Sequence, residues 1–240
     1  MIIVVFFMVI LSEAEPSWPP FALFCNCLAR IFDNSELFVV VSATVVYFKE
    51  KSNREIQRQN EFSNILRNSS DFSTKALVKI LEQNKSEGIL FTQRNFSGIQ
   101  SLEGIDLSHA DMSGSIFKGV GFMKANLRNS VFYRSNLHNA NMEDTSLMEA
   151  DLREANLHNT TLDRASLQRA DLREANLYKA TLRNADLNRA NLNGADLTEA
   201  NLYGADLSWV NLNRVHFKKT KMPDGAVWDR PERKYWNVWS

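Results

Sequence analysis

Cysteine is nearly missing from this chain of 240 residues, since only Cys25 and Cys27 occur. Residues 28–240 therefore have no disulfide framework to hold them together. A zinc site is also disfavoured, because the two cysteines stand one residue apart and no further Cys or His lies near them. We expect both to act as small apolar side chains, with S-acylation beside a membrane as the alternative.

A surplus of charge is missing as well, because 28 basic residues balance 28 acidic ones. Proteins that bind nucleic acid usually carry a basic surplus, so we predict no nucleic-acid partner. The motifs GxSxG, HExxH, GxGxxG and the P-loop are all absent, and no Cys/His nucleophile pair is evident. We therefore predict neither an enzyme nor a bound cofactor.

No apolar run reaches the length of about 20 residues that a membrane-spanning helix needs. Segments 1–11 and 37–48 are shorter uncharged runs, and Arg30 is the only basic residue before position 49. By the positive-inside rule, a basic cluster after the second run places the following chain in the cytoplasm. We predict that residues 1–48 associate with a membrane; the alternative is a soluble cytoplasmic protein that buries this segment. The cluster consists of Lys49, Lys51, Arg54 and Arg58.

Residues 49–86 are mostly polar and predict helices that lead from the membrane surface to the rest of the chain. Ser73 stands where a helix N-cap is expected. The following residues place Leu77, Ile80 and Leu81 on one face of a short amphipathic helix. That helix is well placed to cover one end of the domain that follows.

A period of five residues dominates the second half of the sequence. Taken at every fifth position, residues 107–222 give 24 positions, with 17 Leu, 4 Phe and 3 Met. The residue two places earlier is Ala in 14 of the 24 repeats, and the residue between them is Asp or Asn in 15. This A(D/N)LXX unit fits neither the 3.6-residue period of a helix nor the period of 2 of a strand. It predicts a chain that turns a corner every five residues, with Leu and the small residue inside and the other three outside.

This repeat resembles that of the pentapeptide-repeat proteins, over about residues 101–224. The resemblance implies an all-β solenoid, a right-handed quadrilateral β-helix with four five-residue repeats in each coil. The octet ADLREANL, which occurs at 150–157 and again at 170–177, would then lie in successive coils. We expect the structural core ladder to contain Leu152, Leu157, Leu162, Leu167, Leu172, Leu177, Leu182, Leu187, Leu192 and Leu197.

Four segments follow from these patterns. Residues 1–48 form the apolar anchor, 49–86 the helical region that leads to and caps the repeats, 87–225 the β-helix, and 226–240 a Trp-rich tail. Both ends of a solenoid leave unpaired strand edges. At the far end Trp228, Trp236 and Trp239 are predicted to fold back as a lid, with an interfacial anchor as the alternative; an end-to-end homodimer is a further arrangement that such edges allow.

Outward positions of the repeats suggest a function in binding. Coils of four repeats would stack His138 on His158, but without a carboxylate or cysteine in their column they are expected to be exposed residues and no metal ligands. Arg and Tyr, which favour protein interfaces, are frequent outside. We predict a non-enzymatic scaffold with an unidentified protein partner. The candidate surface comprises Tyr133, Arg153, Arg173, Tyr178, Arg183 and Tyr203.

One alternative function also comes from the resemblance. Some pentapeptide-repeat proteins imitate DNA in shape and charge and bind DNA gyrase. Such imitation requires a strongly acidic rod, whereas residues 101–222 contain 15 acidic and 15 basic residues. The neutral balance disfavours a gyrase-binding protein.

Overall fold

The computed structural model describes residues 35–68, 73–86 and 91–228, with side chains from Val46 onward. The chain divides into two compact units, Met1–Glu61 and Phe62–Ser240. Most of the segment expected to be a membrane anchor, including both cysteines, lies outside the described residues, as do Trp236 and Trp239 of the tail.

Helix α3, Ser35–Arg67, contains both the apolar run at 37–48 and the polar segment after it. The segment boundary expected between residues 48 and 49 thus falls inside one helix. The change from apolar to polar side chains alters which surroundings the helix prefers, but it does not interrupt the helical backbone. The side chains of Val46, Tyr47 and Phe48 are all at least half exposed. Within the described residues, no helix combines the length and the apolar character that crossing a bilayer requires.

Helix α4, Thr74–Ser86, begins and packs as its sequence predicts. The Ser73 hydroxyl accepts a hydrogen bond from the backbone N–H of Ala76 at 3.3 Å, as an N-cap does. Leu77 and Leu81 are buried in the same core as Phe62 and the first coil of the repeats. The end of α3 and the inner face of α4 therefore extend the core of the solenoid.

Helix α4 also closes the first edge of the solenoid by polar contacts. In later coils, the residue equivalent to Asp106 donates its backbone N–H to the preceding coil. Asp106 has no preceding coil in the part of the chain that the structure describes, and its N–H donates instead to Glu82 Oε1 at 2.9 Å. Lys85 Nζ lies 2.9 Å from the Asp106 carboxylate. A helix thus supplies the hydrogen bonds that a further coil would have made.

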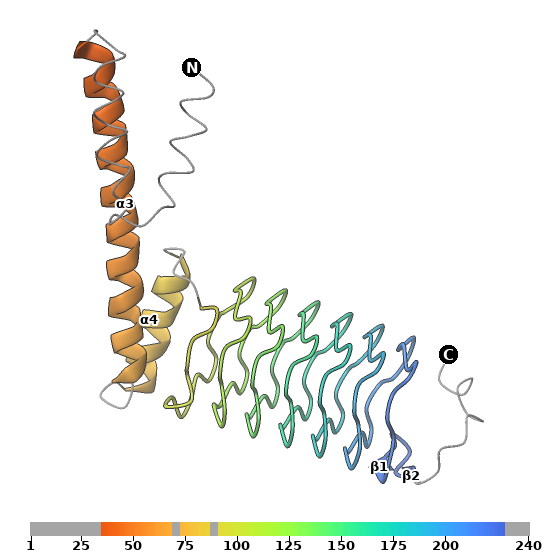
Figure 1. The fold of residues 1–240 in the computed structure, drawn as a ribbon. Coiled ribbons are helices and arrows are strands. Elements are labelled where there is room, and N and C mark those ends of the chain that lie inside the picture. The colour runs from red at the N-terminus through yellow and green to blue at the C-terminus, as the bar shows by residue number, and fades with distance from the viewer. Residues whose placement is uncertain (1–34, 69–72, 87–90, 229–240) are drawn as a thin grey trace. The chain divides into compact units, whose positions relative to one another are not determined.

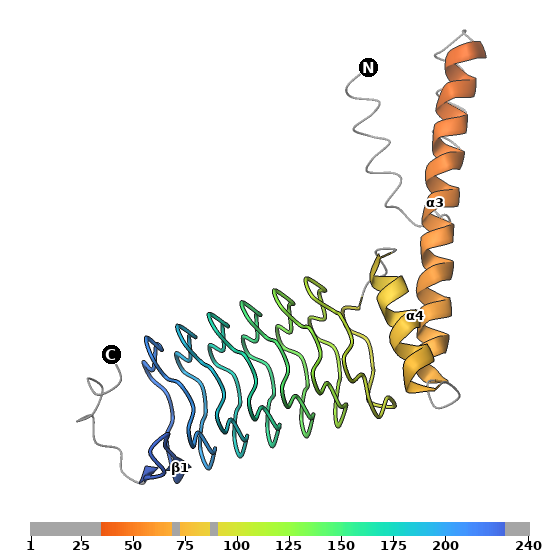
Figure 2. The ribbon, with the colours of Figure 1, turned by 180° about the vertical axis from the view of Figure 1, so that it is seen from behind.

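Residues 91–222 wind into coils that stack along one axis (Figures 1 and 2). Parallel bridges join residues 20 apart, such as Asp151 with Asp171 and Asn156 with Asn176. Between these coils Leu152 N–H donates to Asp171 O at 2.7 Å, and Asp171 N–H donates to Ala150 O at 2.9 Å. The predicted coil of four five-residue repeats is confirmed. The twin octets lie in successive coils.

The regular corners of the coil are type II β-turns. In one example, Ala155 N–H donates to Leu152 O at 3.1 Å, and Glu154 between them has φ 56°. An i to i+3 hydrogen bond with positive φ only at the third residue defines this turn. This hydrogen bond and the positive φ recur every five residues. The regular corners join short extended segments into a square coil.

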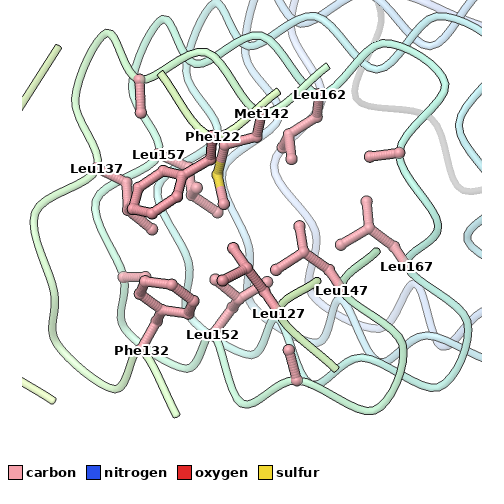
Figure 3. Close-up of a cluster of buried hydrophobic side chains, with 14 of the residues drawn as sticks. Phe122, Leu127, Phe132, Leu137, Met142, Leu147, Leu152, Leu157, Leu162 and Leu167 are labelled. Carbon is pink, nitrogen blue, oxygen red and sulfur yellow. The ribbon is translucent and has the colours of Figure 1, made fainter. Parts of the chain in front are cut away.

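The interior contains the Leu, Phe and Met side chains at the centre of each repeat, together with the small residues (Figure 3). The ten leucines of the predicted ladder are buried, each at most 1% exposed. Thr replaces Ala at a few small positions without leaving its hydroxyl unpaired; Thr160 Oγ1, for example, donates to Leu137 O at 2.9 Å. Burial of one Leu contributes about 1.5–3 kcal/mol, so the ladder is the main source of stability.

The repeats begin earlier than their regular pattern indicates. Phe91 and Phe96 occupy the central position and are buried, but Leu102 follows Phe96 with one position more than the regular spacing of five. Asn95 is accordingly bridged to Ile116, 21 positions later, whereas the later bridges join residues 20 apart. Phe96 stacks on Phe117 with ring centroids 4.5 Å apart. Aromatic rings thus fill the first coils, where one extra residue interrupts the period.

At the far end the chain turns back in a hairpin whose two strands have two residues each. Strand β1, Thr220–Lys221, pairs antiparallel with β2, Val227–Trp228. The Trp228 ring packs against Phe217 with centroids 5.7 Å apart. Trp228 thus folds back onto the last coil, as predicted for this one of the three tryptophans.

Candidate interaction surface

Three residues of each repeat face outward, and the first of them stabilises the backbone by a local hydrogen bond. All 15 Asp and Asn residues that precede a central residue from Leu107 onward accept a hydrogen bond from the N–H two residues later, a local Asx turn. Asn191 Oδ1, for instance, accepts from Asn193 N–H at 3.1 Å. The Asp/Asn preference therefore serves the fold, which leaves the last two residues of each repeat as the positions that can vary on the surface.

Residues 20 apart form columns along the solenoid, and the six predicted surface residues fall into three of them. Tyr133, Arg153 and Arg173 share one column, and Arg183 and Tyr203 share another. These two columns are ten positions apart in sequence, half a coil, so they lie on opposite sides. The column of Tyr178 lies between them. The predicted residues thus do not form a single patch.

The column of Tyr133 is a continuous arrangement of rings and guanidinium groups. The guanidinium groups of Arg134 and Arg153 lie 4.9 and 5.3 Å from the centre of the Tyr133 ring. The Tyr133 hydroxyl donates to Glu154 Oε1 at 3.1 Å, and Arg134 pairs with the same carboxylate at 2.7 Å. This column presents an aromatic face and paired cations to solvent.

Arginines in this column are already neutralised by aspartates of their own repeats. Arg153 and Arg173 each approach the Asp two residues earlier to 2.6 Å. The hydrogen bond from Arg153 lowers the pKa of Asp151, although burial opposes that shift. Arg153 also lies 3.8 Å from Asp171 in the next coil. Stacked like charges are therefore offset within the column.

The column of Tyr178 contains a stack of three rings. The His138 and His158 centroids are 4.6 Å apart, and the His158 and Tyr178 centroids 5.1 Å. His138 Nδ1 lies 3.1 Å from His158 O, so Nδ1 carries the hydrogen of this bond. Burial, followed by the charges of His138 and Lys179, lowers the pKa of His158. No group of three metal-ligating side chains occurs among the described residues.

On the opposite side, the column of Arg183 and Tyr203 lies beside a second group of ion pairs. Lys221 Nζ lies 4.8 Å from the centre of the Tyr203 ring. Arg164, at the neighbouring position, reaches Glu143 at 2.6 Å and Asp144 at 2.8 Å. The hydrogen bonds to Asp144 and Glu143 raise the pKa of Arg164.

Sequence reasoning missed the most exposed large apolar side chain that the structure describes. Trp209 is 69% exposed and occupies the corner position with φ 60°. The sequence could have indicated this exposed side chain, because tryptophan replaces the residue, usually polar or glycine, at the last position of the repeat. Tyr203 is less exposed, at 46%.

Comparisons with known proteins agree with the coil geometry. The model of the pentapeptide repeat region matches residues 115–197, and the model of pentapeptide repeats (8 copies) matches 100–129 and 182–218. No curated protein matches the chain. Three similar solved structures are themselves pentapeptide repeat proteins.

Among them is a thylakoid lumen protein of Arabidopsis thaliana, with 35% identity over 40% of this chain and 68% of its own, and a TM-score of 0.40. Rfr23 of the cyanobacterium Cyanothece 51142 has 30% identity over 54% of this chain and 92% of its own, with a TM-score of 0.36. HetL of Nostoc, involved in heterocyst differentiation regulation, has 24% identity over 62% and 98%, with a TM-score of 0.31.

The family models and the sequence identities define a solenoid protein built from five-residue repeats. The chain belongs to the pentapeptide repeat family. Membership implies the right-handed β-helix that the sequence resemblance predicted.

Proposed function

We propose that this chain is a non-enzymatic scaffold, a rigid rod whose surface columns bind a protein partner. One observation carries the proposal: core side chains fill the interior while the last two residues of each repeat remain outside. Variation at those positions changes the surface without altering the core. The column of Tyr133, Arg153 and Arg173 is the first candidate contact, because Tyr and Arg supply most binding energy at protein interfaces.

The rod is also proposed to be tethered to the cytoplasmic face of a membrane. Support comes from α3, where Val46, Tyr47 and Phe48 are exposed although apolar, and basic residues follow at once. Apolar side chains without a protein partner are stabilised at the headgroup boundary, where Tyr is also favoured. The segment before α3 would supply the remaining apolar surface.

Cell fractionation of the tagged protein tests the tether. We expect the full chain in the membrane fraction and a variant without residues 1–49 in the soluble fraction. A soluble full chain would refute the tether and leave a soluble scaffold. Crosslinking followed by mass spectrometry then tests partner binding: Tyr133→Ala with Arg153→Ala should lose a partner that Asn193→Ala, in the same column, retains. An unchanged crosslink pattern would refute the proposed contact.

The gyrase-binding alternative is disfavoured by the neutral total charge of residues 101–222. The ion pairs of Arg153, Arg164 and Arg173 neutralise the carboxylates that a DNA-like surface would need to display. A pull-down with purified gyrase tests this alternative directly. The end-to-end homodimer remains a hypothesis that the molar mass in solution will decide.

A further inference from the structure

Charge is distributed unevenly along the solenoid although its total is zero. Residues 101–206 contain 15 acidic and 11 basic residues, whereas 207–222, the first part of the last coil, contain 4 basic and no acidic residues; Asp224 follows them. The two segments together give the 15 acidic and 15 basic residues of the whole rod. We call residues 207–222, with Tyr203 and Val227 beside them, the terminal tip.

The cations of the terminal tip lie along two neighbouring sides of the last coil. Positions five apart occupy successive corners of a coil, so Arg214 and Lys219 lie at neighbouring corners, and Lys221 is the second residue of the repeat that follows. Lys218 stands beside Lys219. Among the described residues, none of these four cations forms an ion pair, in contrast to Arg153, Arg164 and Arg173 in the middle of the rod. These two sides of the tip are therefore positively charged, although Lys221 also lies over the Tyr203 ring, 4.8 Å from its centre.

At this end of the rod the core is incompletely covered. Val210, Leu212 and Val215 are only partly buried, whereas their equivalents one coil earlier, such as Leu192, are fully buried. Trp209 is 69% and Val227 62% exposed. The tip thus combines an incompletely covered apolar end, the exposed aromatic residues Trp209 and Tyr203, and four cations on two neighbouring sides.

We propose that the terminal tip docks on the anionic headgroups of a phospholipid membrane. Lys and Arg are attracted to the negative surface potential of such a leaflet. Trp and Tyr are enriched at the level of the headgroups, because each combines a large apolar ring with one polar group that can bind water or a headgroup. Cations beside exposed apolar side chains match both layers of that boundary. An acidic protein would pair the cations but would leave Trp209 and Val227 without an apolar counterpart. This contact is separate from the proposed tether at the other end of the chain.

Lysine footprinting on the full chain tests the proposal. The protein is mixed with vesicles of phosphatidylcholine alone or with phosphatidylserine added, labelled with an amine reagent and analysed by mass spectrometry. We expect labelling of Lys218, Lys219 and Lys221 to fall at least threefold with phosphatidylserine. Lys118 and Lys124, exposed in the early coils, are internal controls and should not change.

Variants separate this contact from the tether. Arg214→Gln/Lys218→Gln/Lys219→Gln/Lys221→Gln should abolish the difference between the two vesicle types, as protection of the Trp209 indole from a soluble quencher reports. Lys118→Gln/Lys124→Gln, the matched control, should retain it. A chain that stays in the membrane fraction but shows no protection of the tip would overturn the proposal and leave the tether intact.

Three further outcomes would also overturn it. Equal protection by both vesicle types would show apolar contact without headgroup recognition. Protection without vesicles would show that residues 229–240 or a second copy covers the tip. Protection by a soluble polyglutamate peptide, with none by vesicles, would assign the tip to an acidic protein.

Discussion

The imidazole rings of His138 and His158 lie 4.6 Å apart in successive coils, and the pKa of His158 is lowered. Burial is the main cause, and the charges of His138 and Lys179 add to it. The unfolded chain binds the proton at an ordinary pKa of about 6.5. The stabilising effect of neutral His158 is therefore complete above about pH 6.5 and is lost as the pH falls toward the lower pKa of the folded state.

This relationship predicts acid sensitivity in the mildly acidic range. His158→Gln should reduce the loss of melting temperature between about pH 7 and about pH 5, because the chain then lacks the imidazole whose protonation burial opposes. His216→Gln, at an exposed position of the last coil, is the control and should behave as the unsubstituted chain. Equal losses in all three proteins would contradict the prediction.

Core and surface positions that are adjacent in sequence should respond differently to substitution. Leu172 is fully buried, so Leu172→Asp should unfold the local coils and reduce the circular dichroism signal of the β-structure. Arg173→Ala breaks an exposed ion pair worth under about 1 kcal/mol and should keep that signal. Equal loss in the two variants would show that residue 172 does not face the core.

The Asp/Asn position should contribute to stability through its Asx turn. Asn191→Ala leaves the N–H of Asn193 without its acceptor and should cost about 0.5–1.5 kcal/mol in the free energy of unfolding. Thr181 occupies the same position of its repeat and makes no such bond within the described residues, so Thr181→Ala should cost less. Urea denaturation measures both, and a larger cost for Thr181→Ala would disprove the assignment.

Corners of the solenoid should tolerate glycine better than β-branched residues. Arg189 has φ 61°, a conformation that disfavours side chains branched at Cβ. Arg189→Val should reduce the free energy of unfolding by about 1–2 kcal/mol. Arg189→Gly should be tolerated, because glycine adopts positive φ without steric cost. Thermal unfolding of the pair decides the matter, and equal stability of the two variants would count against a type II corner.

The period of five was enough to predict a corner every five residues and the side chains inside, because Leu and the small residue take the same buried place in every repeat. The number of four repeats in each coil came from the resemblance to pentapeptide-repeat proteins. The extra residue between Phe96 and Leu102 escaped this reasoning, since a single irregular spacing breaks the pattern that identifies a repeat. The role of Asn191 and its equivalents also escaped it, because an Asx turn depends on local hydrogen-bond geometry.

The candidate surface was predicted by residue type alone and proved harder to place. Composition marked Arg153 and Arg183 as alike, yet their columns lie on opposite sides of the coil. The partners that neutralise Arg153 become apparent only when coils are stacked. Trp209 was overlooked because its exposure depends on its position in the last coil.

Disulfide trapping tests the central claim, that residues 20 apart face each other in adjacent coils. In a Cys25→Ser/Cys27→Ser background, Asn156→Cys with Asn176→Cys should form an intramolecular disulfide readily, because strands joined by a bridge lie about 4.8 Å apart. Asn156→Cys with Ser166→Cys, half a coil away, should not. Rapid crosslinking of the second pair without the first would contradict the account.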